Sequence, residues 1–300
     1  MPQFYTTAYL ASDGYEAQLV AELSAAGITV MRRHHRLFLT DGPAVRSVWA
    51  ANVWHEATTT AIASIGHAGA ELKRRQRNWA TYAPEHAGRS RLVAERLPYM
   101  STKPLVLGAP APTAPLGSWT LLTPSEMLAA ERCDSPFPNG EMSLTEDRVG
   151  PPSRAYLKLW ESFVRLGRFP GPGDSCTDLG ASPGGWTWLL ATLGATVTAI
   201  DKAPLAPTVA SLPGVEWQQG SAFAIEPTAV DYLVCDVIAY PKRTMALIER
   251  WLPFVGAMVC TVKFQGETDH AAIAGLNAIQ RGRVVHLHHN KHEVTFLYAR

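Results

Sequence analysis

The sequence predicts an α/β protein, with a doubly wound, mostly parallel sheet in its C-terminal half and a smaller α/β or α+β domain before it. Two observations support this fold class. From residue 153 onward, short apolar runs typical of buried strands alternate with stretches typical of helices. The last two apolar runs, RVVHLHH and EVTFLYA, are separated by only a few residues. We therefore expect them to pair as an antiparallel hairpin at the edge of the sheet.

Composition indicates a globular protein. The chain has 300 residues, of which 47% are hydrophobic and 18% charged, enough for one large domain or two ordinary ones. No apolar run approaches the ~18 residues of a membrane span, and the first residues lack the pattern of a signal peptide. The four cysteines form no CxxC pair and are expected to be reduced thiols. We expect a cytoplasmic protein without a membrane partner, and the oligomeric state stays open.

The chain is expected to have three parts. Residues 1–103 should form the N-terminal domain, with strands at 4–11 and in ITVMRRHHRLFL, a helix at 14–26, and further helices around 43–54 and 57–78. Residues 104–150 contain proline-rich and aperiodic stretches, which predict a linker or an irregular segment. Residues 151–300 should form the domain with the doubly wound sheet.

Basic residues cluster in the N-terminal domain, although the net charge is only +1. The clusters lie at 32–36, 73–77 and 89–96. Such patches can bind a phosphate backbone, and solvated helix faces are the alternative. Trp79 and Tyr82 lie among the charges and are candidates either for stacking on unpaired bases or for the core. We expect this domain to bind RNA.

A glycine-rich loop follows the first strand of the C-terminal half, in the motif DLGASPGGW at 178–186. Glycines permit tight turns and let a ligand approach the main chain. The spacing fits a dinucleotide fingerprint poorly, and the Gly-Lys-Ser/Thr of a phosphate loop is absent. The pattern favours a pocket for a nucleoside joined to an amino acid, as in S-adenosyl-L-methionine. Asp201, at the end of the next strand, should accept hydrogen bonds from the ribose diol.

The motif DLGASPGGW resembles the DLGAxPGGW of the FtsJ family of RNA 2′-O-ribose methyltransferases. Four other segments match that family's Lys-Asp-Lys-Glu tetrad in order. They place Lys158 in PPSRAYLKLWE, Asp236 in VCD, Lys263 in TVKF and Glu293 in HEVTFLYAR. The resemblance covers residues 150–300 and is loose before them. It implies a Rossmann-like class I S-adenosylmethionine-dependent methyltransferase domain, which usually ends in an antiparallel hairpin.

The resemblance also implies S-adenosyl-L-methionine as cofactor and RNA, in particular ribosomal RNA, as partner. Relatives commonly carry an aspartate near Ser221 that contacts the adenine, and the Ser221 hydroxyl can also form a hydrogen bond. The cofactor-binding residues implied in this chain are Asp178, Gly180, Ser182, Pro183, Gly184, Gly185, Trp186, Asp201, Ser221 and Asp236.

The tetrad suits proton removal from a ribose 2′-hydroxyl, which is a poor nucleophile near neutral pH. A lysine can act as the base only where burial and a second cation lower its pKa. We assign Lys263 as the base and Lys158 as the second cation, which also orients the ribose. Asp236 and Glu293 should position the two ammonium groups. Transfer from a sulfonium needs no metal.

Other readings stay open. The acceptor could be another RNA or a small molecule, or the protein could bind S-adenosylmethionine and RNA without catalysis. Methylation of base amino groups is disfavoured, because the Asn/Asp-Pro-Pro-Tyr/Phe motif of that class is replaced by the sequence 236–240, DVIAY. Histidines 286, 288, 289 and 292 lack a carboxylate or cysteine to complete a ligand set, so we predict no metal site.

Overall fold

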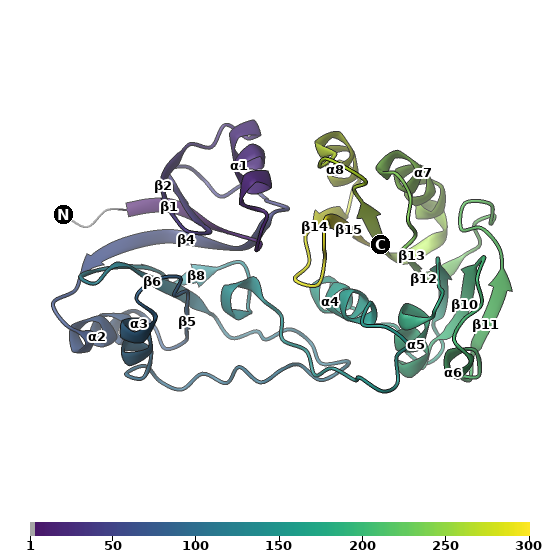
Figure 1. Ribbon diagram of the computed structural model, residues 1–300, viewed down its shortest axis with the longest axis horizontal. Helices are drawn as coiled ribbons and strands as arrows, with labels where there is room; N and C mark the ends of the chain where they lie inside the picture. Colours follow the sequence, from purple (N-terminus) through teal and green to yellow (C-terminus); the bar gives the residue numbers. More distant parts are fainter. Residues whose placement is uncertain (1–3) are drawn as a thin grey trace. The chain divides into compact units, whose positions relative to one another are not determined.

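The computed structural model describes residues 4–300 and divides the chain into two compact units (Figure 1). Unit 1 contains the chain up to Pro104 together with Pro112–Ser143. Unit 2 contains Leu105–Ala111 and Leu144–Arg300. The segment 105–111 belongs to unit 2, where Leu105 forms a parallel β-bridge with Leu144.

Unit 1 is built on an eight-stranded sheet with three helices. Seven strands follow the order β2-β3-β1-β4-β7-β6-β5, and β8 pairs with β4. The elements are β1 (Phe4–Ala11), α1 (Glu16–Ala25), β2 (Val30–His34), β3 (Leu37–Thr40), β4 (Ala50–Ala61), α2 (Ile65–Arg75), β5 (Trp79–Thr81), α3 (Ala87–Ala94), β6 (Gly117–Thr123), β7 (Glu126–Ala130), β8 (Arg132–Cys133) and a 3₁₀ turn at Pro138–Gly140.

Two expectations for this half are wrong. The helix expected around 43–54 is not present, because residues 50–61 form the long strand β4 between β1 and β7. The second expected helix, 57–78, is shortened to α2, whose first amide groups are capped by the Ser64 hydroxyl. Residues 104–150, which were expected to form a linker or an irregular segment, also contain regular structure. Strands β6 and β7 lie within them and complete the sheet of unit 1, burying Trp119 and Met127 against α2 and α3.

Unit 2 has a seven-stranded sheet with helices on both faces (Figure 1). Its elements are α4 (Tyr156–Leu166), β9 (Ser175–Leu179), α5 (Gly185–Thr192), β10 (Thr196–Asp201), α6 (Pro207–Ala210), β11 (Val215–Gln219), β12 (Val230–Cys235), α7 (Pro241–Trp251), a 3₁₀ turn at Leu252–Phe254, β13 (Val255–Lys263), α8 (His270–Asn277), β14 (Gly282–Val285) and β15 (Glu293–Ala299).

The sheet of unit 2 has the predicted topology. Its order is β11-β10-β9-β12-β13-β15-β14, and the first five strands are parallel. The central strands β12 and β13 are almost continuously apolar, as expected for strands covered on both faces. The antiparallel hairpin of β14 and β15 forms the edge of the sheet, and β15 runs antiparallel to β13. Strand order reverses between β9 and β12, which is where open α/β sheets bind their ligands.

The helices of the described chain are too short or too polar to cross a membrane.

Candidate active site

The glycine loop lies at the carboxyl end of β9 and leads into α5. Gly180 has a φ of +80°, and a Cβ at this position would lie 2.7 Å from the side chain of Val237. Gly184 has a φ of +112°, and a Cβ there would lie 2.9 Å from Val209. Both positions therefore require glycine for backbone conformation and for space. The loop is packed tightly at these two glycines, and of its side chains Pro183 is exposed and Ser182 is partly buried.

Asp201 ends β10 beside this loop. One of its carboxylate oxygens accepts a hydrogen bond from the Ser182 amide at 3.0 Å, and the other accepts one from the Ala203 amide at 2.9 Å. A carboxylate has about four acceptor sites, so about two remain for a ligand such as a diol. Ser221 follows β11 and is only partly buried. The acidic and hydroxyl groups expected to bind a nucleoside thus follow consecutive strands at one edge of the sheet.

Four of the predicted cofactor residues are buried, namely Asp178, Gly184, Gly185 and Trp186. The Asp178 carboxylate is 1% exposed and accepts a hydrogen bond from the Thr187 hydroxyl at 2.7 Å. Burial raises the pKa of Asp178 to about 7, and the charges of Asp236 and Asp201 add to the effect. The Trp186 indole is also buried, and its N–H donates to the Ala155 carbonyl at 2.8 Å. Asp178 and Trp186 therefore fix the loop to α5 and to the start of α4.

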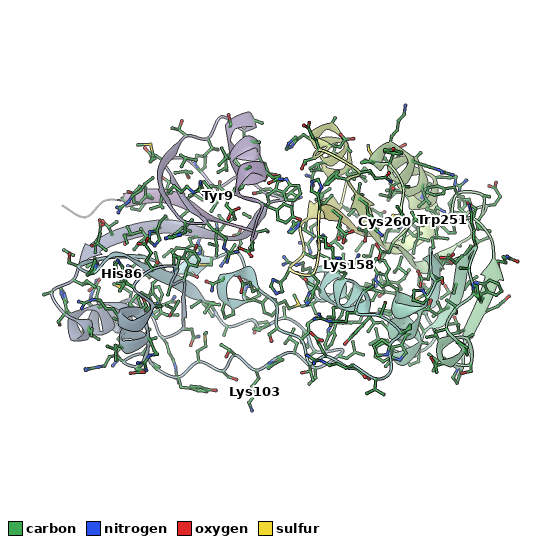
Figure 2. All side chains as sticks on the ribbon, in the orientation of Figure 1. Tyr9, His86, Lys103, Lys158, Trp251 and Cys260 are labelled. Carbon is green, nitrogen blue, oxygen red and sulfur yellow. The ribbon has the colours of Figure 1, made fainter. Side chains whose placement is uncertain are left out.

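The four tetrad residues lie together in unit 2, with side chains between 10% and 21% exposed. Lys158 lies in the first turn of α4. Figure 2 labels this residue. Its ammonium nitrogen lies 3.0 Å from a carboxylate oxygen of Asp236 and 3.0 Å from one of Glu293. The ammonium nitrogen of Lys263 lies 3.0 Å from the other Asp236 oxygen. Asp236 thus binds both lysines.

Strand register explains why these residues meet. Lys263 is the last residue of β13 and Glu293 the first of β15, and they are direct partners across the antiparallel pair. Asp236 follows β12, the parallel neighbour of β13. The Lys263 ammonium also donates a hydrogen bond to the Asp236 carbonyl oxygen at 2.8 Å. The side chain of Lys263 is thereby held at the carboxyl edge of the sheet.

The groups around Lys158 shift its pKa. Burial acts to lower its pKa, but the two nearby carboxylates and their hydrogen bonds outweigh burial, and the pKa of Lys158 is raised. Lys158 therefore remains an ammonium ion at neutral pH. This protonation state fits the second-cation role expected for Lys158 and excludes it as a base.

One residue near the tetrad was missed in the sequence. Glu161 lies one turn after Lys158 on α4, and its side chain is fully buried. Its carboxylate accepts hydrogen bonds from the Arg165 guanidinium, from the amide groups of His288 and His289, and from the His289 ring. Burial opposes ionisation, but these donors prevail and lower the pKa of Glu161 to about 2. Glu161 thus ties the 286–292 turn, which precedes Glu293, to the helix of Lys158.

Two histidines of the 286–292 turn have structural contacts. His289 binds Glu161, and the His286 ring lies 3.1 Å from the Lys291 carbonyl within the turn. Burial lowers the pKa of His286 to about 4, so this ring is neutral near neutral pH. Within residues 4–300, no group of three or more histidine, cysteine, aspartate or glutamate side chains is placed to hold a metal ion.

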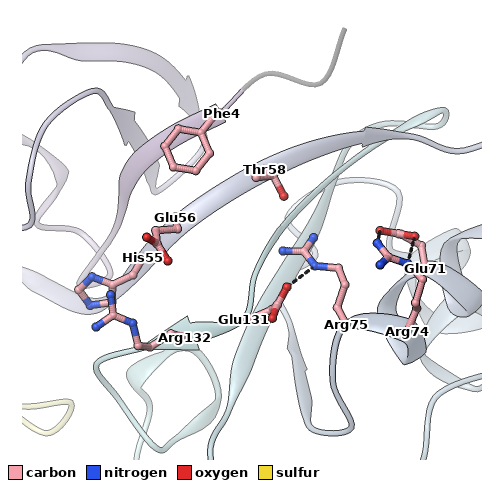
Figure 3. A pocket seen from close by; sticks show the side chains of 9 residues that line it. All are labelled: Phe4, His55, Glu56, Thr58, Glu71, Arg74, Arg75, Glu131 and Arg132. Carbon is pink, nitrogen blue, oxygen red and sulfur yellow. Dashed lines mark hydrogen bonds and ion pairs between the residues drawn. The ribbon is translucent and has the colours of Figure 1, made fainter.

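The basic stretch of unit 1 differs from expectation. Trp79 and Tyr82 are 5% and 6% exposed, so of the two alternatives left open for them the structure shows the core position. Arg74 pairs with Glu71 and Arg75 with Glu131 in a groove of about 570 Å³ (Figure 3). The charged residues lining this groove are three arginines, one histidine and three glutamates, so its charge is mixed: Arg74, Arg75, Arg132, His55, Glu56, Glu71 and Glu131.

The sheet order of unit 2 and its glycine loop define an α/β domain of the methyltransferase type. Residues 151–283 match the family model described as FtsJ-like methyltransferase. Among curated proteins, ribosomal RNA large subunit methyltransferase M of Halorhodospira halophila is 41% identical over 175 residues, covering 55% of this chain and 51% of that protein. The protein of the same name from Marinobacter nauticus is 34% identical over 195 residues, covering 55% of this chain and 52% of that protein.

Solved structures resemble the chain only distantly. A Streptococcus mutans chain described as a methyltransferase and crystallised with SAH is 14% identical, with a TM-score of 0.37, covering 49% of this chain and 99% of that one. The chain spans about half the length of the curated relatives that it matches.

Proposed function

We propose that this protein transfers a methyl group from S-adenosylmethionine to a ribose 2′-hydroxyl of RNA, with ribosomal RNA as the substrate. The observation that carries the proposal is the paired cluster of Lys158, Asp236, Lys263 and Glu293 beside a glycine loop. The ribosomal substrate is suggested by the names of the relatives matched by this half of the chain.

The residues around the glycine loop fit the methyl donor. Gly180 and Gly184 allow the left-handed backbone turns of the loop, at φ +80° and +112°, and its close packing against Val237 and Val209. Asp201 retains acceptor sites for a ribose diol, and Ser221 offers a hydroxyl group one strand further on. Bound there, S-adenosylmethionine would supply an electrophilic methyl group on a sulfonium. Asp178 and Trp186 act indirectly, since both are buried beneath the loop.

The tetrad residues would act on the ribose that accepts the methyl group. Lys158 stays charged and is held by two carboxylates, so it can orient the ribose without taking its proton. Lys263 is the group that we propose accepts the 2′-hydroxyl proton, while Asp236 keeps the Lys263 side chain in place and Glu293 binds Lys158. Holding the oxygen about 3 Å from the methyl carbon would supply much of the acceleration.

Product analysis tests this proposal. The purified chain is incubated with methyl-labelled S-adenosylmethionine and ribosomal RNA, and the RNA is digested to nucleosides for mass spectrometry. The label should appear in a 2′-O-methylated nucleoside. A label on a base would identify another methyltransferase class, and cofactor binding without any transfer would identify a binding protein. Mapping of ribose methylation in cells lacking the protein would then locate the nucleotide.

We further propose that unit 1 contacts RNA through cations on and after α2. Lys73 and Arg77 are exposed, whereas Arg74 is paired with Glu71. Reversal of either charge, by Lys73→Glu or by Arg77→Glu, should weaken RNA binding and flatten its salt dependence. Lys103→Glu, another exposed position of unit 1, is the matched control for a change in net charge. Equal effects at all three positions would reject a specific contact.

A further inference from the structure

The short segment between β12 and α7 joins the two parts of the site. It begins after Asp236, which binds Lys158 and Lys263. The next residue, Val237, packs against the glycine loop, since a Cβ on Gly180 would lie 2.7 Å from its side chain. Asp236 and Val237 therefore connect the tetrad to the cofactor loop, and Ile238 to Tyr240 follow directly in the chain.

Two large apolar side chains of this segment face solvent. Ile238 is 80% exposed and Tyr240 is 67% exposed, while Ala239 between them is buried. Tyr240 has extended backbone angles, φ −63° and ψ 146°. With Ala239 buried between them, Ile238 and Tyr240 both lie on the solvent side of the segment. Single exposed apolar residues are ordinary, but an adjacent pair at the edge of a reactive cluster is typical of a binding surface.

Cations follow this apolar pair. Lys242 and Arg243 lie in the first turn of α7 and are exposed. Positive charge at the start of a helix opposes the helix dipole, so helix stability does not account for these residues. The Arg243 guanidinium lies 3.8 Å above the ring of Phe223, which leaves Lys242 as the more outlying charge. An exposed aromatic ring followed by cations matches the chemistry of single-stranded RNA, whose bases stack and whose phosphates pair.

We propose that Ile238, Tyr240 and Lys242 form the acceptor surface, on which an unpaired base of the RNA stacks against Tyr240 while Lys242 contacts a phosphate. This inference rests on the proposed function and deepens it by assigning a single-stranded stretch as the substrate. A base can stack on an exposed ring only when it is out of its own helix. The surface thereby selects an unpaired target beside the tetrad.

Equilibrium binding of RNA to the full chain tests the inference. The probes are a fluorescently labelled 20-nucleotide single-stranded RNA of mixed sequence and its blunt duplex. Tyr240→Ala should weaken single-strand binding on the order of tenfold, and Tyr240→Phe, which keeps the stacking plane, should stay within about twofold of the unmodified chain. Phe254→Ala is the control. Phe254 is 41% exposed and lies just before β13, at the opposite edge of the sheet from the tetrad.

Three results would overturn the inference. They are unchanged single-strand binding by Tyr240→Ala, a loss no larger than that of Phe254→Ala, and a loss by Tyr240→Phe as large as that of Tyr240→Ala. Thermal midpoints of all variants should match, since these side chains are exposed. Methyl transfer is measured in parallel. Absence of transfer by the unmodified chain would reject the proposed function and leave the binding comparison valid, whereas normal transfer with unchanged binding would reject only the acceptor surface.

Discussion

The ammonium nitrogen of Lys158 lies 3.0 Å from a carboxylate oxygen of Glu293, although the two residues are 135 positions apart in the sequence. The same nitrogen lies 3.0 Å from Asp236. One cation therefore separates two carboxylates that would otherwise repel each other in a mostly buried cluster. The raised pKa of Lys158 is the electrostatic counterpart of this arrangement.

Removal of this cation should disable the cluster. In Lys158→Met, Asp236 and Glu293 would face each other without a charge between them, and the rate of methyl transfer should fall at least about 100-fold. Single-turnover assays measure this rate. Because the groups act as a unit, adding Asp236→Asn to Lys158→Met should cost little more. If the loss of rate in the double variant equals the product of the losses in the two single variants, the two residues act independently.

Cofactor affinity should depend on Asp201. Its carboxylate both orders the glycine loop through the Ser182 amide and keeps acceptor sites for a diol, so Asp201→Ala should weaken S-adenosylmethionine binding at least about tenfold. Titration calorimetry gives the dissociation constants. Glu216→Ala removes an exposed acid from the neighbouring strand β11 and should leave the affinity unchanged. Equal affinities for both variants would place the cofactor elsewhere.

Acid stability should depend on Glu161. Its folded-state pKa is lowered to about 2, so its contribution to stability is present above about pH 4.5 and is lost as the pH falls toward 2. Glu161→Gln should lower the free energy of unfolding on the order of 3 kcal/mol at neutral pH and abolish this acid-dependent part. Denaturant titrations over a pH series measure both effects. Glu249→Gln, at an exposed position on α7, should change neither.

The same variant has a local signature. In Glu161→Gln an NH₂ group replaces one of the two carboxylate oxygens, so one of the His288 and His289 amides loses its acceptor, and the amides of this turn should exchange hydrogen faster than those at the far end of β15. A uniform increase across unit 2 would show that Glu161 contributes only to global stability and does not hold the turn before Glu293.

Asp178 should have the opposite pH dependence. Its pKa is raised to about 7, chiefly by burial, so the unfolded chain ionises first and stability falls as the pH rises from about 4 to about 7. Asp178→Asn cannot ionise and keeps an acceptor for the Thr187 hydroxyl. It should raise the thermal midpoint at about pH 8, with the gain vanishing near about pH 4. Asp231→Asn gives the contrast, because hydrogen bonds from Ser175 lower the pKa of Asp231 and its loss should destabilise.

The C-terminal half could be predicted because its signals are local. Strands β10 and β13 end at Asp201 and Lys263, and Asp236 directly follows β12. A parallel sheet brings these strand ends to one edge, so the three residues could be placed from sequence order alone. Strand β4 was misread as helix because its buried residues do not alternate regularly, which leaves helix and strand patterns difficult to separate. The β-branched run Thr58–Thr60 was the signal that favoured a strand.

Glu161 could not be predicted by the same reasoning. A charged residue three positions after a lysine on a helix is typical of a solvated face. Its burial depends on the turn at 286–292, which returns to α4 more than a hundred residues later and supplies amide donors. Trp79 is a similar case. Its neighbours in sequence are charged, but β6 and β7 cover it from a segment that reads as a linker.

The most direct test of the account is methyl transfer by Lys263→Ala. Lys263 is held by the Asp236 carbonyl and carboxylate and faces Glu293 across β13 and β15, apart from the glycine loop. The account predicts that the variant binds S-adenosylmethionine with nearly unchanged affinity and transfers no methyl group to RNA. Lys263→Arg should be almost as inactive, because a guanidinium cannot give up its proton near neutral pH. Near-normal turnover by Lys263→Ala would contradict the assignment of the base and, with it, the role proposed for the tetrad.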